Sequence, residues 1–237
     1  MRVARGVLLA ITCGFWTCSA ASAADFSDDF QATHADRWQE SGKSNDWIVT
    51  EGALRRTGSG DTIYRAKLSP LKDMEVETRV RLIGGTRETF GVALRCEGNT
   101  YLLVRYYDAP KALELLSYQD GNWKETGSRS EQLSVEREKW YRLKVAAVGD
   151  RVLAKLWPDG SEEPDWQLDV AVNHLSPGTF ALVAHDDTQI EFDWANATAD
   201  NEFLSQMRVA AEKRERERLK ELHAKLKLAA VPEAHTS

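Results

Sequence analysis

The sequence predicts an all-β fold, a two-sheet antiparallel jelly-roll sandwich, followed by one long C-terminal α-helix. Between residues 25 and 198, short segments alternate apolar and polar residues, and turn signals separate them about every 8 to 12 residues, which is typical of sandwiches and jelly rolls. From Asp200 onward neither Gly nor Pro occurs before Pro232, and Arg, Lys, Glu, Ala and Leu dominate. This composition predicts a single helix that ends near Ala230.

The N-terminus has the features of a secretory signal peptide. Arg2 and Arg5 precede an apolar run over residues 6–18, and small residues end at Ala23, the order of a signal peptide with its cleavage site. The run is shorter than the roughly 20 residues that span a bilayer, and no later segment is apolar enough to do so. We therefore expect export to the periplasm or medium after cleavage near Ala23. The expected units are a signal peptide (1–23), a jelly-roll domain (24–199), a charged helix (200–231) and a disordered tail (232–237).

The net charge argues against two classes of partner, and the cysteine content argues against an internal disulfide. The chain has 237 residues and a net charge of −6, which argues against a basic face for nucleic acid and, equally, against anionic membrane surfaces. Cleavage after Ala23 leaves Cys96 as the only cysteine. No internal disulfide can then form, so the domain must depend on its core.

The first strands of the predicted sandwich are short. Residues 25–30 form a first strand, and residues 53–56 and 62–66 form two more around a Gly-Ser-Gly-Asp turn. Residues 74–82 alternate apolar side chains with Glu and Arg, so that strand buries one face and leaves the other charged. Trp38, Trp123 and Trp166 lie near turns, where we expect a rim.

The central strands at residues 90–94, 101–107 and 113–118 carry the main pattern. Leu102, Val104 and Tyr106 suit the core. The opposite side of these strands therefore forms a second face with a different composition. It carries Tyr101, Leu103, Arg105 and Tyr107 from one strand and Glu114, Leu116 and Tyr118 from the next.

The clearest hairpin spans residues 140–157, with a turn at Gly149. Period-two alternation places one set of its side chains in the core and the other set outside. Trp140 and the later Trp194 are expected in the core. The other core assignments in this hairpin are Tyr141, Leu143, Val145, Val152, Ala154 and Leu156.

The predicted helix has three parts. Phe203, Leu204 and Met207 can pack on the sandwich, whereas residues 212–218 are charged on every side. Leu219, Leu222 and Leu226 then form an apolar stripe shorter than the three or four heptads that predict a coiled coil. Two interpretations stay open: a solvated helix stabilised by ion pairs four residues apart, or self-association through the stripe.

Several short motifs occur in one order along residues 25–198. They are Asp-Asp-Phe at 28–30, Glu-Gly-Ala-Leu at 51–54 after Trp47, Phe-Gly-Val-Ala-Leu-Arg at 90–95, Trp-Tyr-Arg-Leu-Lys-Val at 140–145 and Phe-Asp-Trp at 192–194. The ordered set resembles the concanavalin A-like, laminin-G-like jelly-roll domains of secreted bacterial proteins. Within these domains it is most similar to carbohydrate-binding modules and 3-keto-disaccharide hydrolase-like domains. The resemblance implies two curved sheets, a concave face that commonly receives sugar, and a carbohydrate or glycosylated partner.

Acidic residues on one strand are the first candidates for catalysis. Asp73, Glu75 and Glu77 share a strand face, and neighbours two residues apart lie about 6.5 Å apart along a strand, near the roughly 5–5.5 Å of a retaining glycosidase pair. Arg79 and Arg81 continue the face without an aromatic ring, which favours cross-strand ion pairs instead. Glu75, Glu77 and Glu114 are therefore weak catalytic candidates for a glycoside or 3-keto-glycoside hydrolase.

The second face of the central strands is the candidate binding site. Flat apolar rings pack against the C–H faces of sugars, and planar polar groups beside them bind the hydroxyls. The alternative is a second layer covered by a loop or by the helix. The expected ligand-binding residues are Arg95, Tyr101, Arg105, Tyr107, Glu114 and Tyr118, with Lys155 and Trp157 from the hairpin.

We therefore predict an exported, non-catalytic glycan-binding module that uses its concave face. The alternatives are the hydrolase named above and a structural protein that assembles through its C-terminal helix. Related jelly-roll domains often carry a structural calcium between the first and last strands, and Asp193 is the matching position here. Oxygen ligands suit calcium, although an aspartate hydrogen-bonded at a strand end explains the residue equally. No other cofactor is expected, since P-loop, dinucleotide and nucleophile-elbow motifs do not occur in the sequence.

Overall fold

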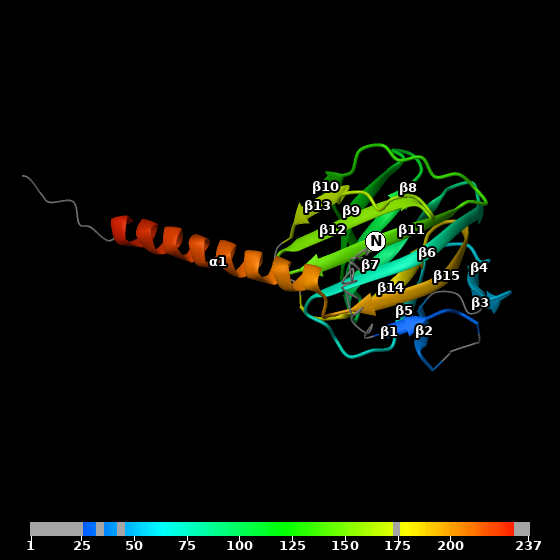
Figure 1. Cartoon of the computed structure of the whole chain (residues 1–237), viewed down its shortest axis with the longest axis horizontal. Coiled ribbons are helices and arrows are strands. Elements are labelled where there is room, and N and C mark those ends of the chain that lie inside the picture. The colour runs from blue at the N-terminus through cyan, green and yellow to red at the C-terminus, as the bar shows by residue number, and fades with distance from the viewer. Residues whose placement is uncertain (1–25, 32–35, 42–45, 173–175, 230–237) are drawn as a thin grey trace, which may run out of the picture.

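The computed structural model describes residues 26–31, 36–41, 46–172 and 176–229. The expected signal peptide with its cleavage site at Ala23, and the expected tail at 232–237, lie outside the described residues. The described part is a β-sandwich with one C-terminal helix (Figure 1). This confirms the predicted fold class.

Two antiparallel sheets form the sandwich, and their strands are listed here in spatial order. One sheet contains β13 (Leu168–Ala171), β12 (Arg151–Pro158), β11 (Trp140–Val148), β6 (Met74–Gly84), β15 (Gln189–Thr198), β4 (Ala53–Arg56) and β3 (Trp47–Thr50), with β1 (Phe26–Asp28) also pairing with β15. The other contains β10 (Asn122–Arg129), β9 (Ala112–Gln119), β8 (Thr100–Tyr107), β7 (Thr89–Glu97), β14 (Thr179–Ala184), β5 (Thr62–Ala66) and β2 (Trp38–Ser41). We call them the eight-stranded and the seven-stranded sheet.

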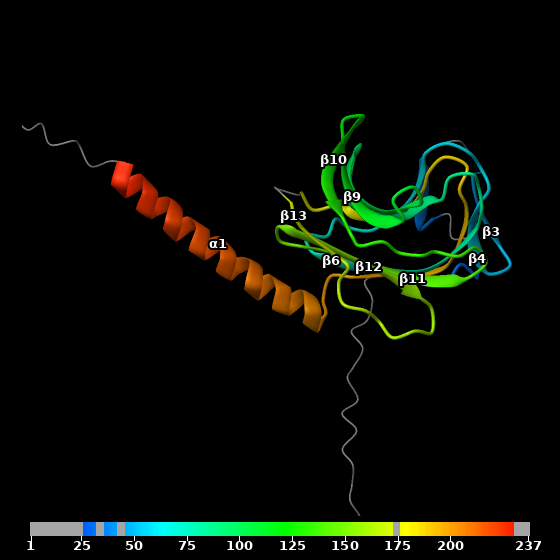
Figure 2. The same ribbon diagram turned by 90° about the horizontal axis from the view of Figure 1, so that it is seen from above.

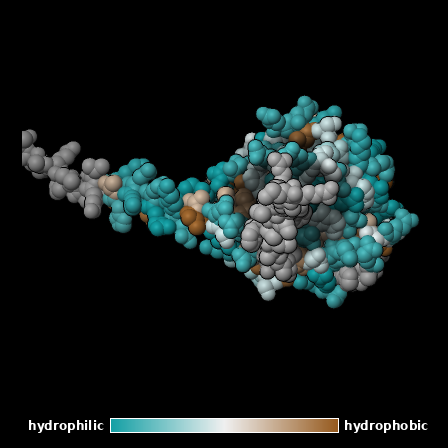
Figure 3. All heavy atoms as spheres, viewed as in Figure 1, coloured by the Kyte–Doolittle hydropathy of each residue, from teal (hydrophilic) through white to brown (hydrophobic). Residues whose placement is uncertain are grey.

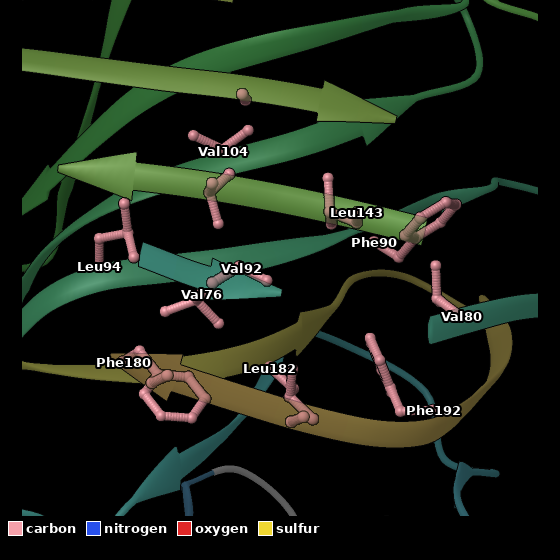
Figure 4. Packing of buried hydrophobic residues seen from close by; sticks show 14 of the residues in the cluster. Val76, Val80, Phe90, Val92, Leu94, Val104, Leu143, Phe180, Leu182 and Phe192 are labelled. Carbon is pink, nitrogen blue, oxygen red and sulfur yellow. The ribbon is translucent and has the colours of Figure 1, made fainter. Parts of the chain in front are cut away.

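The core lies between the two sheets and follows the predicted alternation. Figure 4 shows side chains from β6, β11 and β15 meeting those from β7, β8 and β14. All six core assignments in the β11–β12 hairpin are confirmed, since each of these side chains is buried in this cluster. Leu102, Val104 and Tyr106 of β8 are buried in the same cluster, as predicted.

Trp38, Trp140 and Trp194 do not lie where the sequence predicts. Trp38 is buried rather than at a rim: its ring stacks on Tyr64 at 4.9 Å between centroids, and its Nε1 donates to Asp28 Oδ2 at 2.8 Å. Trp140 and Trp194 lie on the outer face of the eight-stranded sheet, not in the core. The alternation that buries Tyr141 turns Trp140 outward, beneath the guanidinium groups of Arg79 and Arg81.

Trp194 is displaced by an irregularity in β15. The register between β15 and β6 shifts between Phe192 and Trp194. A bulge of this kind changes which face the following residues occupy. Phe192 is therefore buried in the core, whereas Trp194 lies outside against Arg142.

Helix α1 (Glu202–Ala229) is fixed to the sandwich at its N-terminal end and then extends away from it (Figures 1 and 2). The Asn201 side chain accepts a hydrogen bond from Leu204 N at 2.8 Å and so caps the helix. Phe203, Leu204 and Met207 pack against an apolar cluster on β11 and β12, as predicted. Among the described residues, no helix is long and apolar enough to cross a membrane.

The core assignments make a simple stability prediction. Leu143→Ala removes a fully buried side chain and should lower the free energy of unfolding by about 2–5 kcal/mol, measured by urea denaturation. Ile48→Ala is the control, because Ile48 is 42% exposed and its loss should cost about 0.5 kcal/mol or less. Equal effects of the two substitutions would contradict the assigned core.

Candidate functional site

The outer face of the seven-stranded sheet is hollow, and its floor is apolar. Figure 2 shows β9 and β10 curving away from the rest of this sheet on the side opposite the eight-stranded sheet. The floor forms a second cluster, separate from the core, in which burial raises the pKa of the Cys96 thiol to about 12. This cysteine therefore stays protonated and acts as an apolar residue. The buried members of the floor are Ile63, Ala93, Cys96, Tyr101, Leu103, Ala181 and Val183.

Aromatic side chains cover this floor, and we call them the aromatic cover: Tyr101, Tyr118, Trp123 and His185. Trp123, Tyr118 and Tyr101 are cross-strand neighbours on β10, β9 and β8. Their ring centroids lie 4.7 Å (Trp123–Tyr118) and 4.9 Å (Tyr118–Tyr101) apart. The Trp123 ring also reaches His185, beyond the end of β14, at 5.6 Å. Because the floor is covered, the exposed apolar surface is that of Trp123, which is 38% exposed.

A small pocket of about 170 Å³ opens beside the aromatic cover. It is smaller than the roughly 300–1,000 Å³ of pockets for drug-sized ligands. A carboxylate, an amide, an imidazole and hydroxyls surround the rings. The lining residues are Ser41, Asp61, Thr62, Ile63, Asn99, Tyr101, Tyr118, Trp123 and His185.

A second hollow of about 430 Å³ adjoins the first and shares Asn99 and Tyr101 with it. It lies beside the β7–β8 and β9–β10 turns, where Glu97, Gln119 and Asp120 contribute polar groups. The two hollows therefore share part of their lining, which is aromatic on the sheet and polar at the turns.

A buried arginine positions two sides of the pocket. Arg56 has no exposed surface, and its guanidinium donates to the carbonyl oxygens of Gly60, Asp186 and Thr188. The backbone links the same loops, since Gly60 N donates to Asp186 O at 2.7 Å. These bonds fix the loop that carries Asp61 against the loop that carries His185. The pocket is therefore formed before any ligand arrives.

His185 is an uncharged polar group at neutral pH. Burial lowers its pKa below the usual value, and Arg105 adds to this effect, while Asp61 acts in the opposite direction. The imidazole Nδ1 lies 3.8 Å from the nearer Asp61 carboxylate oxygen. A neutral imidazole offers one donor and one acceptor, which suits a hydroxyl-bearing ligand.

A charged row lies next to the aromatic cover on the same face. Glu114 is buried, and both of its oxygens are engaged: Arg105 Nη2 donates to one at 3.1 Å and Arg129 Nε to the other. The Arg105 guanidinium also lies over the Tyr107 ring, 4.6 Å from its centroid. The structure therefore brings together Tyr101, Arg105, Tyr107, Glu114 and Tyr118 of the predicted ligand-binding residues.

The Arg95 side chain does not lie beside the aromatic cover on this face, which corrects the prediction, although Arg95 lines the second hollow. β7 has an irregular register between Leu94 and Glu97, and Arg95 has a left-handed φ of 52°. This bulge shifts the alternation by one residue, so that Cys96 joins the floor while Arg95 turns away. The buried Arg95 side chain instead pairs with Asp73 at 3.5 Å.

Lys155 and Trp157 also lie elsewhere, because β12 belongs to the eight-stranded sheet. Their side chains are on the outer face of that sheet, on the opposite side of the sandwich. Lys155 Nζ pairs with Glu163 at 2.8 Å and lies over the Trp166 ring. The expected rim role of Trp166 is replaced by packing between Lys155 and Phe203.

The structure separates Glu114 from the other two weak catalytic candidates, Glu75 and Glu77, which lie together on β6. Glu77, on the outer face of the eight-stranded sheet, pairs with Arg142 and Lys144. Glu75, two residues earlier, accepts from Asn201 at 3.2 Å, and burial raises its pKa. Glu114 lies on the other side of the sandwich, in the seven-stranded sheet. Glu114 therefore cannot pair with Glu75 or Glu77, while Glu75 and Glu77 share one face of β6, where the expected cross-strand ion pairs are present.

The residues considered for calcium have other partners. Asp193 accepts from Arg79 Nη1 at 2.9 Å, and Asp28 accepts from Phe30 N and Trp38 Nε1. A guanidinium beside the carboxylate does not fit a cation site at Asp193. In the part of the chain that the structure describes, no cluster of three His, Cys, Asp or Glu side chains is placed to bind a metal ion.

Sequence reasoning did not identify Asp61, Asn99 and His185 as site residues. They come from three separate turns, and their positions depend on how the loops meet. Trp123 was expected only at a rim, although its alternation with the polar residues of the 119–125 hairpin was a usable signal. Arg56 was missed because its short strand gives no indication that its guanidinium binds three carbonyls.

Solved structures share this architecture. Carbohydrate binding module CBM66 from Bacillus subtilis has a TM-score of 0.55 at 18% identity, covering 65% of this chain and 91% of that chain. The VIP36 exoplasmic/lumenal domain, in its Ca2+/Man3GlcNAc-bound form, has a TM-score of 0.51 at 15% identity, covering 70% and 86%. The chain has a concanavalin A-like sandwich fold.

Further comparisons show how far the similarity to known proteins extends. A xylan beta-1,4-xylosidase from Bacillus halodurans C-125 has a TM-score of 0.54 at 20% identity, and the match covers 73% of this chain but 38% of that enzyme. No protein-family model and no curated protein matches the sequence. At these identities the likeness to a concanavalin A-like sandwich concerns the fold alone.

The buried imidazole of this concanavalin A-like sandwich predicts a pH dependence. Because the pKa of His185 is lowered, the unfolded chain takes up a proton below about pH 6.5 that the folded chain excludes. The free energy of unfolding should therefore fall as the pH drops from about 6.5 toward 5. His185→Gln should flatten this part of the profile, measured by urea denaturation at each pH. An unchanged slope in the variant would contradict a lowered pKa.

The role assigned to Arg56 is testable in the same way. Arg56→Met removes a fully buried guanidinium that donates to three carbonyl groups, one of them in the buried residue Thr188, and should cost about 2–5 kcal/mol of stability. Arg87→Met is the matched control, since the Arg87 side chain is 64% exposed and contacts Asp186 only at 3.9 Å. If the two variants unfold at the same urea concentration, Arg56 does not hold the loops.

Proposed function

We propose that this protein is an exported, non-catalytic module that binds a glycan on the concave face of its seven-stranded sheet. The observation that carries the proposal is the exposed Trp123 indole, held within the aromatic cover beside a pocket with polar groups on its other sides. Of the residues expected from the sequence, Tyr101 and Tyr118 lie in the pocket, and Arg105, Tyr107 and Glu114 lie in the neighbouring row.

The chemistry of the pocket matches a sugar ring. A pyranose has apolar C–H faces that pack on an aromatic ring, and its hydroxyls lie around the edge. Trp123 offers the ring. Around it, Asp61 offers hydrogen-bond acceptors, and Asn99 and the neutral His185 each offer both a donor and an acceptor. The volume suits one sugar residue, and the adjoining polar hollow past Asn99 would receive the next residue of the chain.

The comparisons support a glycan ligand in general terms. One structural neighbour is a carbohydrate-binding module, and another was solved with Man3GlcNAc bound. A binding rather than a hydrolytic role is supported by the carboxylates themselves. Asp61 is the single carboxylate among the residues lining the small pocket, and the nearby Glu114 is engaged by two arginines. The carboxylates of the adjoining hollow, Glu97 and Asp120, belong to its turns.

Isothermal titration of the full chain against a polysaccharide panel tests the proposal. We expect binding to at least one member and a loss of about tenfold or more in affinity for Trp123→Ala, because the stacking surface is removed. Trp140→Ala is the matched control, since this half-buried indole lies on the opposite sheet.

Circular dichroism must show the same fold in both variants. The proposal fails if no polysaccharide binds the folded wild type, or if Trp140→Ala loses affinity as Trp123→Ala does. New reducing ends in the titrated mixture would support the hydrolase alternative instead.

A further inference from the structure

The C-terminal end of α1 carries exposed leucines that are bordered by cations. We propose that these last turns of α1 bind to the surface of an anionic phospholipid bilayer and so attach the sandwich to the membrane. The inference does not depend on the glycan site, which lies on the other sheet.

The orientation of α1 is fixed by its first half. Leu204 is fully buried in the contact with β11 and β12. Arg208 Nε donates to the buried carboxylate of Asp73 at 2.9 Å, and Arg214 pairs with Asp150 at 3.3 Å. After Arg214 the helix continues to Ala229, which adds about 22 Å at 1.5 Å per residue. The leucines are therefore held away from the sandwich (Figure 2).

The leucines form one narrow stripe. At about 100° per residue, Leu219, Leu222 and Leu226 lie within roughly 60° of one another around the helix. They are 48%, 51% and 58% exposed. Over all 28 residues the helix is only weakly amphipathic, because its middle turns are charged on every side. Figure 3 accordingly shows a mainly hydrophilic helix with small hydrophobic spots.

Cations border the stripe on both sides. Around the helix axis, Arg218 and Lys225 lie about 40–60° from Leu222 on one side of the stripe. Arg216 lies beyond Leu219 on the other side of the stripe. Residues 216–227 contain five Lys or Arg and two Glu, a net charge of +3, so the rest of the chain carries −9. The overall acidity that argues against anionic surfaces therefore belongs to the other parts of the chain. Long basic side chains next to an apolar stripe are typical of helices that lie in a lipid headgroup region.

This charge distribution favours binding of the stripe to anionic lipid over pairing with a second copy of the chain. In a parallel, in-register pair of these helices, the cations beside one stripe would face cations of the other, and Arg216 and Arg218 already pair within their own helix, with Glu212 at 3.5 Å and Glu215 at 3.6 Å. Like charges of this kind destabilise a helix pair. Phosphatidylglycerol headgroups supply the opposite charge, and acyl chains accept the leucines.

Co-sedimentation of the full chain with vesicles tests the proposal. We expect stronger partitioning to phosphatidylcholine vesicles that contain phosphatidylglycerol than to phosphatidylcholine alone, and a decrease at high salt. Leu222→Glu and the double variant Arg218→Glu with Lys225→Glu should each reduce the partition coefficient by about tenfold or more. Every variant keeps the same residues 1–25, so the contribution of the N-terminal apolar run is constant.

Matched controls come from positions outside residues 216–227. Val209→Glu changes an apolar residue that is 66% exposed in the first half of the helix, and Lys213→Glu with Lys111→Glu makes the same change in net charge as the double variant; both should retain binding. Circular dichroism checks the helix content. The proposal is overturned if partitioning is independent of phosphatidylglycerol, or if the controls lose binding equally. It is also overturned if sedimentation velocity shows a dimer that Leu222→Glu dissociates, which would assign the stripe to a second copy.

Discussion

The organisation of the site follows from one constraint: the seven-stranded sheet is apolar on its inner face and also on part of its outer face. Its inner face packs into the core, and its hollow outer face carries a floor with residues such as Leu103 and Val183 that have no exposed surface. An apolar floor on a curved sheet must be shielded from water. The aromatic cover provides this shield, and Trp123 is its exposed member. The same rings thus stabilise the sheet and present a flat apolar surface.

The polar side of the pocket is held in place by a buried guanidinium group, that of Arg56. Arg56 fixes two loops that are far apart in the sequence, and Arg65 Nη2 donates to Gly98 O at 3.0 Å in the turn that carries Asn99. Loops that are already positioned in this way lose little conformational entropy when a ligand binds. The structure therefore has a pre-formed site on one sheet and a helix fixed to the other, which leaves the two proposed binding surfaces independent.

Much of the fold could be predicted from alternation alone, because burial on a strand repeats every two residues. The six core residues of the β11–β12 hairpin show this. Prediction from this alternation fails in two situations. A bulge changes the phase, as at Arg95, and no local pattern indicates which sheet a hairpin joins, as at Lys155 and Trp157. The predicted site was therefore correct in placing Tyr101 beside Tyr118 and incomplete at His185, which tertiary contacts bring to the pocket.

The central claim is that sugar binds against the aromatic cover, and the indole signals of the full chain test it most directly. In a two-dimensional ¹H–¹⁵N NMR titration with a polysaccharide that binds, the Nε1–H resonance of Trp123 should shift and saturate with the binding curve. The resonances of Trp140 and Trp194, on the opposite sheet, should stay in place. A titration in which Trp140 or Trp194 shifts while Trp123 remains unchanged would contradict the account.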